Sequence, residues 1–386
     1  MNSANEVVRW TSIVGARPQF IKLAPICRAI TAHNQSGCYP QIEHSIIHTG
    51  QHYDNAMAEL FFVQLGIPEP SYNLRVGSGT HAEQLARLTE RLEPILARER
   101  VDRVLVYGDT NSTLAGALVA TRLEIPAAHV EAGCRSHNWS MPEEQNRVIT
   151  DHICDVLLAP CRLAVENLAR EGIGGERDPR KRRVAQVGDV MFDALLANLA
   201  VAEVCAELNM RKMGLVSKQY YLLTLHRSEN TDKSERLASI LSTAEDLELP
   251  VIFPVHPRTL RVMNEMKFSL EGGNIRSVAP VGYLDMLMLT KHARKVLTDS
   301  GGVQKEAFYL GVPCVTLREE TEWPETVEAG ANRLAGVNRA RILDAVEQPV
   351  ADFRRTASPF GCGKASQLVV RELLVEHAKD CRNAAD

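Results

Sequence analysis

Three carboxylates stand at or near points where an apolar run of the chain ends. Asp109 follows the run at 101–107, Glu131 follows the run at 126–130, and Glu143 comes soon afterwards in the segment MPEEQNR. Acids at such positions are partly desolvated, and close neighbours can have their pKa values pushed apart, as acid–base catalysis needs. The pattern equally fits a helix cap at Asp109 and a solvated first helical turn at Glu143, so the residues alone leave both interpretations open.

The segment TDSGGVQKE at 298–306 is the strongest local signal for ligand binding. A predicted strand ends just before Ser300, and the paired glycines Gly301 and Gly302 open a helix. Backbone N–H groups at such glycines can approach an anion, and a helix N-terminus adds partial positive charge, which suits a phosphate or diphosphate. Glu306, one turn further on, is placed to accept hydrogen bonds from a ribose diol. An ordinary strand–turn–helix corner is the alternative.

A second glycine-containing junction, GARPQFIK at 15–22, carries Arg17 and Lys22 at the start of a predicted helix. Cations there oppose the helix dipole, so their placement costs stability unless an anion is bound. The alternative is a pair of exposed basic residues at a turn. Neither GxGxxG nor GxxxxGK[ST] occurs at this junction, so neither a dinucleotide fingerprint nor a Walker loop is supported.

Histidines end two predicted strands in the second half of the chain. His226 follows the strand at 220–225 and precedes Arg227, and His256 follows the strand at 251–255. A histidine at such a position can stabilise negative charge that develops on a phosphate, although a lone histidine is more often structural. The motifs GxSxG and HExxH are absent, so we predict neither a serine nucleophile elbow, nor a catalytic metal, nor a cofactor.

Short strand patterns alternate with helical patterns along the whole chain. Predicted helices at 19–32 and 111–123 separate strands in the first half, which is typical of βαβ units and a parallel sheet. We therefore predict an α/β fold with two doubly wound, Rossmann-like halves facing a cleft, and ligands at the carboxyl ends of the strands. Strands are predicted at 7–14, 45–48, 101–107, 126–130, 220–225, 251–255, 295–298 and 314–317, and a hinge-like segment is predicted to begin at 184–187.

The chain divides, by composition, into two domains and a final helix. A glycine-, proline- and charge-rich stretch at 172–183 precedes the predicted boundary. We predict an N-terminal domain at 1–186, a second domain at 187–363, and an amphipathic helix at 364–386.

The composition is that of an ordinary globular protein. The chain has 386 residues, 45% hydrophobic and 24% charged, with a net charge of −4 from 44 basic and 48 acidic residues. This balance argues against a partner held by bulk positive charge, such as nucleic acid or an anionic membrane. No basic and apolar leader precedes the first strand, no apolar run reaches the ~18 residues of a membrane span, and the nine cysteines show no CxxC pair. We expect a cytoplasmic protein with free thiols.

Taken together and in order, these segments resemble the non-hydrolysing UDP-N-acetylglucosamine 2-epimerases. Each block is weak alone, but the series covers nearly the whole chain and is specific. The blocks are GARPQFIKLAP from residue 15, HTGQHYD (48–54), VYGDTNSTLAGALVA (106–120), HVEAGCRS (129–136), MPEEQNRVITDH (141–152), VGDVMFDAL (187–195), LTLHRSENTD (223–232), TDSGGVQKEA (298–307) and TEWPETVEAG (321–330).

The resemblance implies the GT-B arrangement, a homodimer, a UDP-sugar substrate, and a final helix that crosses back onto the first domain. It implies that UDP-GlcNAc and UDP-ManNAc interconvert by elimination of UDP to a bound glycal and by its re-addition, with the product used in polysaccharide biosynthesis. The positions that match the family's diphosphate ligands are Arg17, His226, Ser300, Gly301 and Gly302, and Glu306 matches its ribose ligand. The positions that match its residues for sugar handling and acid–base work are Lys22, Asp109, Glu131 and Glu143. The resemblance also places His226 among the catalytic groups.

The chain departs from the family pattern at three places. Asp54 stands after Gln51 where some members carry a second glutamine for a regulatory site, so activation by substrate is in question. Trp323 stands where arginine is common, and Tyr283 and Met286 are the candidates to lie near the uracil.

Several blocks also resemble the epimerases acting on UDP-2,3-diacetamido-2,3-dideoxyglucuronic acid. That substrate has a carboxylate at C5, and Arg135 and Arg318 are the candidate cations for it. Three other possibilities stay open. A hydrolysing relative would release free ManNAc and UDP. A GT-B glycosyltransferase would need an acceptor and would not exchange the C2 proton, and a nucleotide-sugar-binding module would bind without turnover.

Overall fold

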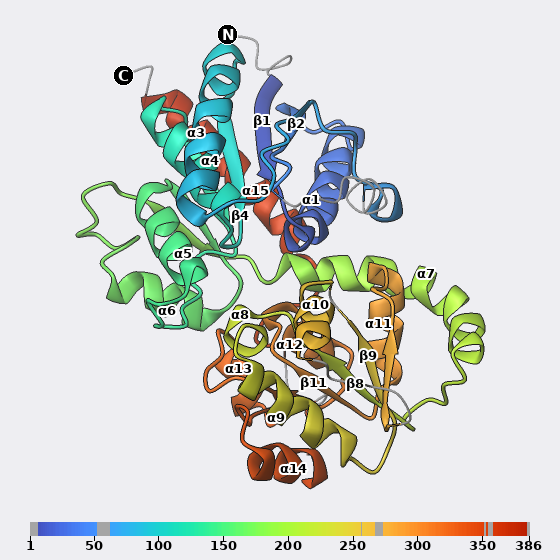
Figure 1. Ribbon diagram of the computed structural model, residues 1–386. Coiled ribbons are helices and arrows are strands. Elements are labelled where there is room, and N and C mark those ends of the chain that lie inside the picture. The colour runs from blue at the N-terminus through green and yellow to red at the C-terminus, as the bar shows by residue number, and fades with distance from the viewer. Residues whose placement is uncertain are drawn as a thin grey trace. The chain divides into compact units, whose positions relative to one another are not determined.

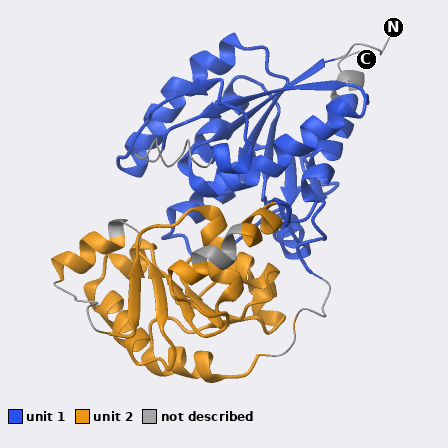
Figure 2. Cartoon of the chain, turned by 90° about the vertical axis from the view of Figure 1, so that its right-hand side faces the viewer, with its two compact units in different colours: residues 1–197, 358–386 blue, residues 198–357 orange. Residues whose placement is uncertain are grey.

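The computed structural model describes residues 7–51, 62–255, 257–266, 273–350, 353 and 358–383, with the backbone alone at 205–209, 257–258 and 379–383. It forms two compact units, the first made of Met1–Ala197 with Ser358–Asp386 and the second of Asn198–Ala357 (Figure 2). Two positions of the sequence analysis, Asp54 and His256, lie outside the described residues. Within the described part, no helix is long and apolar enough to cross a membrane.

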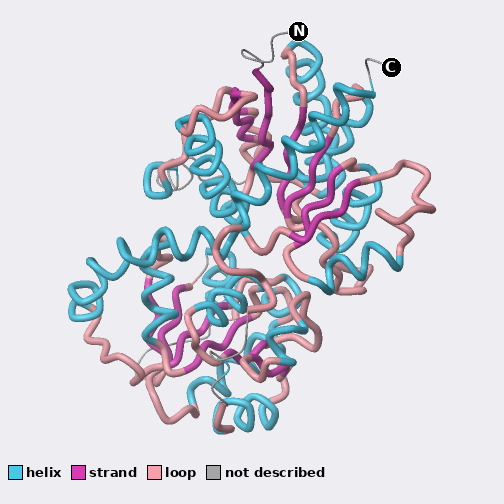
Figure 3. The backbone as a smooth tube through the Cα atoms, turned by 180° about the vertical axis from the view of Figure 1, so that it is seen from behind, coloured by secondary structure: helices cyan, strands magenta, loops and turns pink. Residues whose placement is uncertain are grey.

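Unit 1 is built on a seven-stranded parallel sheet in the order β3-β2-β1-β4-β5-β6-β7, with helices on both faces (Figures 1 and 3). Its strands are β1 (Val7–Val14), β2 (Gln41–His48), β3 (Tyr72–Asn73), β4 (Arg103–Tyr107), β5 (Ala127–Val130), β6 (Val156–Ala159) and β7 (Arg183–Gln186). Its helices are α1 (Arg17–Gln35), α3 (His81–Arg98), α4 (Asn111–Arg122), α5 (Pro142–Ile153), α6 (Arg162–Arg170) and α15 (Ala365–Asn383).

Unit 2 repeats the plan with a six-stranded parallel sheet in the order β10-β9-β8-β11-β12-β13. The strands are β8 (Tyr221–Thr224), β9 (Val251–Pro254), β10 (Ile275–Val278), β11 (Lys295–Thr298), β12 (Cys314–Thr316) and β13 (Asn332–Leu334). The helices are α8 (Ser228–Thr231), α9 (Ser234–Glu245), α10 (Pro257–Glu265), α11 (Tyr283–His292), α12 (Gly301–Tyr309), α13 (Pro324–Glu328) and α14 (Arg339–Glu347), and α7 (Val190–Lys212) spans the division between the units.

The central strands are apolar on both sides because helices cover both faces of each sheet. In β8, Leu222 packs into the core on one face and Leu223 into the core on the other. Side chains alternate across a strand, so a run such as YLLT is fully buried only between two helical layers. The predicted α/β class with two parallel sheets is confirmed.

The strands that carry strong apolar runs were predictable, and the short outer ones were not. Strands β1 and β11 have the predicted bounds, and the other six predicted strands are present with ends moved by a few residues. The unpredicted strands are β3, β6, β7, β10 and β13, which span four residues or fewer, and the segment predicted to begin a hinge at 184–187 lies mostly in β7. Four of these five, β3, β7, β10 and β13, are edge strands of their sheets, where one-sided exposure weakens the apolar signal.

The final helix α15 belongs to unit 1 and packs against α1 (Figure 1). Its start is fixed by Asp193 of α7, whose buried carboxylate accepts hydrogen bonds from the backbone N–H groups of Ala365 (3.1 Å) and Ser366 (2.8 Å). The Ser366 hydroxyl also donates to Asp193, at 2.6 Å. One carboxylate therefore satisfies N–H groups that the first turn of a helix cannot pair internally.

We predict that Asp193→Ala lowers the free energy of unfolding of unit 1 by about 1–3 kcal/mol, because it leaves two buried N–H groups without an acceptor. Urea denaturation followed by circular dichroism measures the loss. Asp193→Asn keeps an acceptor oxygen and should lose less. Equal midpoints for wild type and Asp193→Ala would contradict this account of how α15 is held.

Candidate functional site

Several of the predicted site residues lie at the topological switch points of the two sheets. In unit 1 the chain runs outward in opposite directions from the neighbouring strands β1 and β4, and in unit 2 from β8 and β11. A doubly wound sheet binds ligands outside the carboxyl ends of such strands. Asp109 follows β4 in unit 1, while His226 and Ser300 follow β8 and β11 in unit 2. The functional roles of these residues stay predictions.

The first charged pair of unit 1 joins helix α1 to the end of β5. The Lys22 ammonium lies 2.7 Å from Glu131 Oε1, and the two side chains are only 6% and 10% exposed. Glu131 has a backbone φ of +74°, in the left-handed region, which costs a residue with a side chain about 1 kcal/mol. Such strain is kept where the surroundings fix a side chain in one place, and here it aims Glu131 at Lys22.

Gly108 leaves room for the Lys22 side chain. Its φ is +64°, and a Cβ atom built on it would lie 2.8 Å from Lys22 Nζ and 3.8 Å from Glu131 Oε1. A side chain at residue 108 would therefore displace the ammonium from the carboxylate. The glycine that ends the segment VLVYG thus has a steric reason to precede Asp109.

The side chain of Gln19 connects the junction of β1 and α1 to the end of β4 through hydrogen bonds. Its side-chain oxygen accepts hydrogen bonds from the backbone N–H groups of Gly15 (2.7 Å) and Ala16 (3.1 Å). Its amide nitrogen donates to the Tyr107 carbonyl and to Thr113 Oγ1, both at 3.0 Å. Gln19 was missed by the sequence analysis, although a glutamine at the third position of a helix is a known capping signal.

A second group of charges links Asp109 to helix α5 through Arg147. The buried Arg147 guanidinium pairs with the Asp109 carboxylate and, at 2.8 Å, with Glu144 Oε2. Glu144 also accepts the backbone N–H groups of Ser136 and His137, each at 2.9 Å. Of the adjacent acids in MPEEQNR, Glu144 is therefore engaged in holding the loop before α5, whereas Glu143 is half-buried at the helix start.

In unit 2, the buried Asp299 holds the half-exposed ring of His226. Asp299 Oδ1 lies 3.1 Å from His226 Nδ1, and the same carboxylate accepts the backbone N–H groups of His226 and Arg227. Burial raises the pKa of Asp299, but the His226 charge and these hydrogen bonds outweigh it and hold the pKa below its ordinary value. Because Asp299 is a carboxylate, Nδ1 of His226 carries a proton.

Helix α12 begins at the predicted anion position. Ser300 is its N-cap and accepts a long hydrogen bond, 3.4 Å, from the Val303 N–H, and the first turn contains Gly301 and Gly302. The first N–H groups of a helix have no partner within the helix, and they form a natural anion site. Glu306 is buried one turn later. Three of the five predicted diphosphate residues, Ser300, Gly301 and Gly302, therefore stand at the start of the helix that carries the predicted ribose residue.

Trp323 occupies the position where the sequence analysis expects a cation in related chains. Its ring lies beneath the Lys305 ammonium, with Nζ 3.8 Å from the ring centroid, and both side chains are buried. A Cβ atom on Gly301 would lie 3.3 Å from Trp323 Nε1, so the indole borders the start of α12. Where related chains often carry arginine, this chain therefore has a tryptophan that makes a cation–π contact with Lys305.

The remaining predicted residues are buried or half-buried within their own units. Tyr283 is buried at the start of α11, and Met286 packs against the core of unit 2, so their assignment to a uracil site stays a prediction. Arg17 is half-buried at the start of α1. The two candidate cations for a sugar carboxylate, Arg135 and Arg318, are buried against protein carboxylates.

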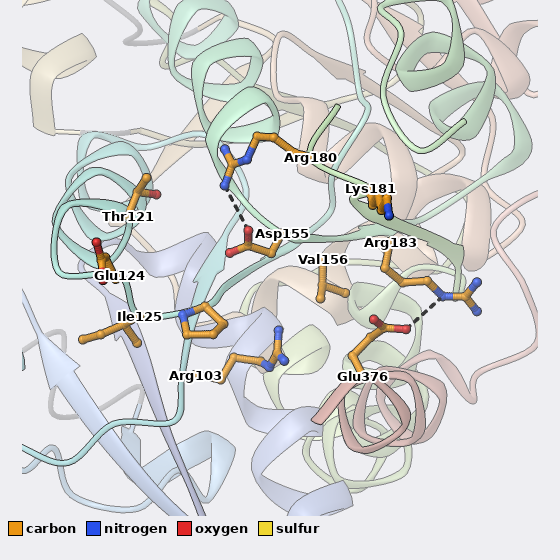
Figure 4. Close-up of a pocket in the computed structure, with 11 residues that line it drawn as sticks. Arg103, Thr121, Glu124, Ile125, Asp155, Val156, Arg180, Lys181, Arg183 and Glu376 are labelled. Carbon is orange, nitrogen blue, oxygen red and sulfur yellow. Dashed lines mark hydrogen bonds and ion pairs between the residues drawn. The ribbon is translucent and has the colours of Figure 1, made fainter. Parts of the chain in front are cut away.

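A cavity of about 530 Å³ lies within unit 1 away from these residues (Figure 4). It sits at the amino ends of β4, β5, β6 and β7, the opposite edge of the sheet from Asp109 and Glu131. Its charges are largely paired within the protein, Arg180 with Asp155 at 2.9 Å and Arg183 with Glu376 at 3.8 Å. Among the described residues no cluster of His, Cys, Asp or Glu is arranged to hold a metal ion.

Comparison with known proteins agrees with this arrangement. The sequence model of the UDP-N-acetylglucosamine 2-epimerase family matches residues 37–374. A UDP-N-acetylglucosamine 2-epimerase of Methanocaldococcus jannaschii is 46% identical over 376 residues, which cover 95% of this chain and 99% of that protein. A UDP-2,3-diacetamido-2,3-dideoxy-D-glucuronate 2-epimerase of Pseudomonas aeruginosa is 43% identical over 367 residues, covering 94% and 98%.

The crystal structure of the Methanocaldococcus jannaschii epimerase in complex with UDP-GlcNAc and UDP superposes with a TM-score of 0.85. The match is 44% identical in sequence and covers 95% of this chain and 100% of that chain. The fold of these epimerases is GT-B-like, so the predicted fold class is confirmed. The family model and the relatives over nearly the full length leave one assignment: the chain belongs to the UDP-N-acetylglucosamine 2-epimerase family.

Proposed function

We propose that this protein interconverts UDP-GlcNAc and UDP-ManNAc at C2. The observation that carries the proposal is the pair of carboxylates at one sheet edge, Glu131 held by Lys22 and Asp109 held by Arg147. A module that only bound a nucleotide sugar would gain little from acids beside an anionic ligand, because like charges repel. An enzyme that moves a proton at carbon needs such acids. The 46% identical Methanocaldococcus jannaschii epimerase supports the same assignment.

The chemistry that fits is elimination followed by re-addition. A base takes the proton from C2, the electron pair of that bond forms the double bond between C1 and C2, and the bond from C1 to the UDP oxygen breaks with its electrons leaving on UDP. In the reverse sense, the UDP oxygen adds to C1 of the glycal and C2 takes a proton on its other face. The C2 proton is weakly acidic, so the departure of UDP must help to drive its removal.

Unit 2 is suited to the leaving group. Negative charge grows on the β-phosphate as C1–O breaks, and donors fixed in place before the reaction stabilise it best. The N-terminus of α12 at Ser300, Gly301 and Gly302 supplies N–H groups, and His226 supplies a ring held by Asp299. Glu306 is the proposed ligand of the ribose, and Arg17 of unit 1 is a further proposed phosphate ligand.

Unit 1 is suited to the proton transfers. Epimerisation requires access to both faces of C2, which gives a physical reason for more than one carboxylate. Asp109, Glu131 and Glu143 are the proposed acids and bases. Lys22 modulates Glu131 directly, since its ammonium lies 2.7 Å from that carboxylate. The predicted homodimer and cytoplasmic location belong to the proposal as well.

The alternative substrate is UDP-2,3-diacetamido-2,3-dideoxyglucuronic acid, favoured by the 43% identical Pseudomonas aeruginosa relative. Its extra carboxylate needs a cation. Arg135 is 1% exposed and paired with Asp151 and Glu171, and Arg318 is 1% exposed and paired with Glu322. Both candidates are therefore committed to protein carboxylates, which favours the neutral sugar.

The proposal is tested by incubating the protein with UDP-GlcNAc in D2O and following C2 by NMR. We expect deuterium at C2 together with the signals of UDP-ManNAc. If C2 exchange occurs only with the diacetamido-uronate, the proposed substrate is wrong and the proposed reaction type is right. UDP binding without exchange for either sugar would contradict the epimerase and favour a transferase or a binding protein.

We predict that Glu131→Gln lowers kcat for C2 exchange by about 100-fold or more, because it removes a proton-transfer group and the partner of Lys22. Asp109→Asn should have a similar effect. Binding of UDP, measured by calorimetry, should change little for both variants. The exposed Glu93→Gln on α3 is the matched control and should keep kcat within about twofold. Full activity in Glu131→Gln would remove this residue from the mechanism.

Asp299→Asn tests the proposed role of His226 in stabilising the departing UDP. It removes the carboxylate that fixes the proton and orientation of His226, and a hydrogen bond to a charged group contributes about 1.5–3 kcal/mol. We therefore expect kcat to fall by roughly 10- to 100-fold. The exposed carboxylate Asp246, changed to Asn, serves as the control in the same unit. Unchanged kcat in Asp299→Asn would show that His226 needs no such support.

A further inference from the structure

His129 lies in β5, two residues before Glu131, and its side chain is fully buried. Its Nδ1 is 2.6 Å from Asp151 Oδ1, and its Nε2 is 2.6 Å from the carbonyl oxygen of Gly108. A carbonyl oxygen only accepts hydrogen bonds, so Nε2 must carry a proton. The protonation of Nδ1 then depends on whether Asp151 is a carboxylate.

The surroundings of Asp151 make it a carboxylate. Its other oxygen accepts hydrogen bonds from Arg135 Nη1 at 2.7 Å and from the Gly133 N–H at 3.0 Å. Arginine is charged at any working pH, and it favours the ionised acid. Burial raises the pKa of Asp151, yet the charges of His129 and Arg135 hold it below its ordinary value. Both ring nitrogens of His129 therefore face acceptors and must both be donors.

Arg135 is shared between Asp151 and Glu171, with two hydrogen bonds of 2.7 and 2.8 Å to Glu171. The Glu171 side chain is 28% exposed, and His152 Nδ1 lies 3.8 Å from its Oε2, so solvent and a second histidine face that acid. Asp151 is fully buried and shares its guanidinium with Glu171, so a protonated His129 gives the buried carboxylate a second cation.

We propose that His129, protonated on both ring nitrogens, is a positioning residue that fixes the turn carrying Asp109. Its imidazolium ties the Gly108 carbonyl, directly before Asp109, to Asp151 of α5. It also stands in the strand that ends at Glu131, so one buried cation links the ends of β4 and β5. The kinetic part rests on the proposed function, whereas the protonation state does not.

The ionisable groups around His129 come from several elements. Asp151 and Cys154 belong to α5 and its end, Arg135 to the loop after β5, and Glu171 to the end of α6. Beyond the Gly108 carbonyl lie the charged pairs of the site, Lys22 with Glu131 and Arg147 with Asp109. Cys154 is held neutral, because burial raises the pKa of its thiol. Asp151 is the anion in direct contact with His129, so it determines the protonation of the imidazole ring.

The first test is nitrogen-15 NMR of the imidazole groups in the wild-type chain, with His129 assigned through couplings to its Cβ. We expect both ring nitrogens of His129 to carry protons at pH 7, since each lies 2.6 Å from an acceptor oxygen. His44 of β2 is an internal contrast, because burial lowers its pKa to about 4 and its ring should be neutral. A neutral tautomer of His129 at pH 7 would overturn the proposal.

The second test separates positioning from simple stabilisation. In His129→Gln we expect kcat for C2 exchange to fall by about 10- to 100-fold while the Kd for UDP stays the same, because a misplaced Asp109 affects chemistry and not the nucleotide. His44→Gln, at a half-buried histidine of β2, is the control and should keep kcat. A folded His129→Gln with wild-type kcat would overturn the positioning role.

Asp151→Asn tests the same link if His129→Gln does not fold. Without the carboxylate, the ring should carry only one proton at pH 7 in the same NMR measurement. A ring that still carries both protons would contradict the role of Asp151. If the wild type shows a protonated His129 but no C2 exchange, the proposed function fails while the charge assignment stands.

Discussion

A carboxylate placed at the buried edge of a parallel sheet needs a cation beside it, and this requirement explains much of unit 1. An uncompensated buried ion costs several kcal/mol. Glu131 is met by Lys22 from α1, Asp109 by Arg147 from α5, and Asp151 by Arg135 together with His129. The helices of the unit are thereby connected to one sheet edge by charge as well as by apolar packing.

Such pairs are weak sources of stability, because desolvation offsets most of their attraction. Their value lies in holding chemically useful groups in one place, ready to act. The left-handed backbone of Glu131 and the steric need for Gly108 fit this view, since each keeps a site geometry that a relaxed turn would lose. Unit 2 uses the same device with Asp299 and His226, where the acid is fully buried and the ring reaches solvent.

The sequence predicted the strand-end positions because apolar runs show where strands stop, and parallel topology brings those ends to one edge. Asp109, Glu131, His226 and Ser300 were found in this way. Partners from distant segments could not be found: Arg147 reaches Asp109 across 38 positions, and Asp299 reaches His226 across 73. Polar residues such as Asp151, which is fully buried in the last turn of α5, cannot be told from solvated ones before the helix is packed.

The sequence also suggested cations for a sugar carboxylate, and packing explains why that inference is weak. Arg135 and Arg318 look available in the sequence, yet each is buried against acids of its own unit. The replacement at Trp323 is a similar case. The missing arginine is accompanied by a cation–π contact from Lys305 beside the start of α12, so the positive charge in that region is carried by another residue.

In the proposed reaction, departure of UDP from C1 accompanies loss of the C2 proton. The most direct measurement uses UDP-GlcNAc with oxygen-18 in the bond between C1 and the β-phosphate, followed by phosphorus NMR. If the bond from C1 to oxygen breaks, the freed phosphate can rotate and the label will spread to the non-bridging positions as epimerisation proceeds. Accumulation of UDP-ManNAc with the label still in the bridge would contradict the elimination and require inversion at C2 with UDP attached.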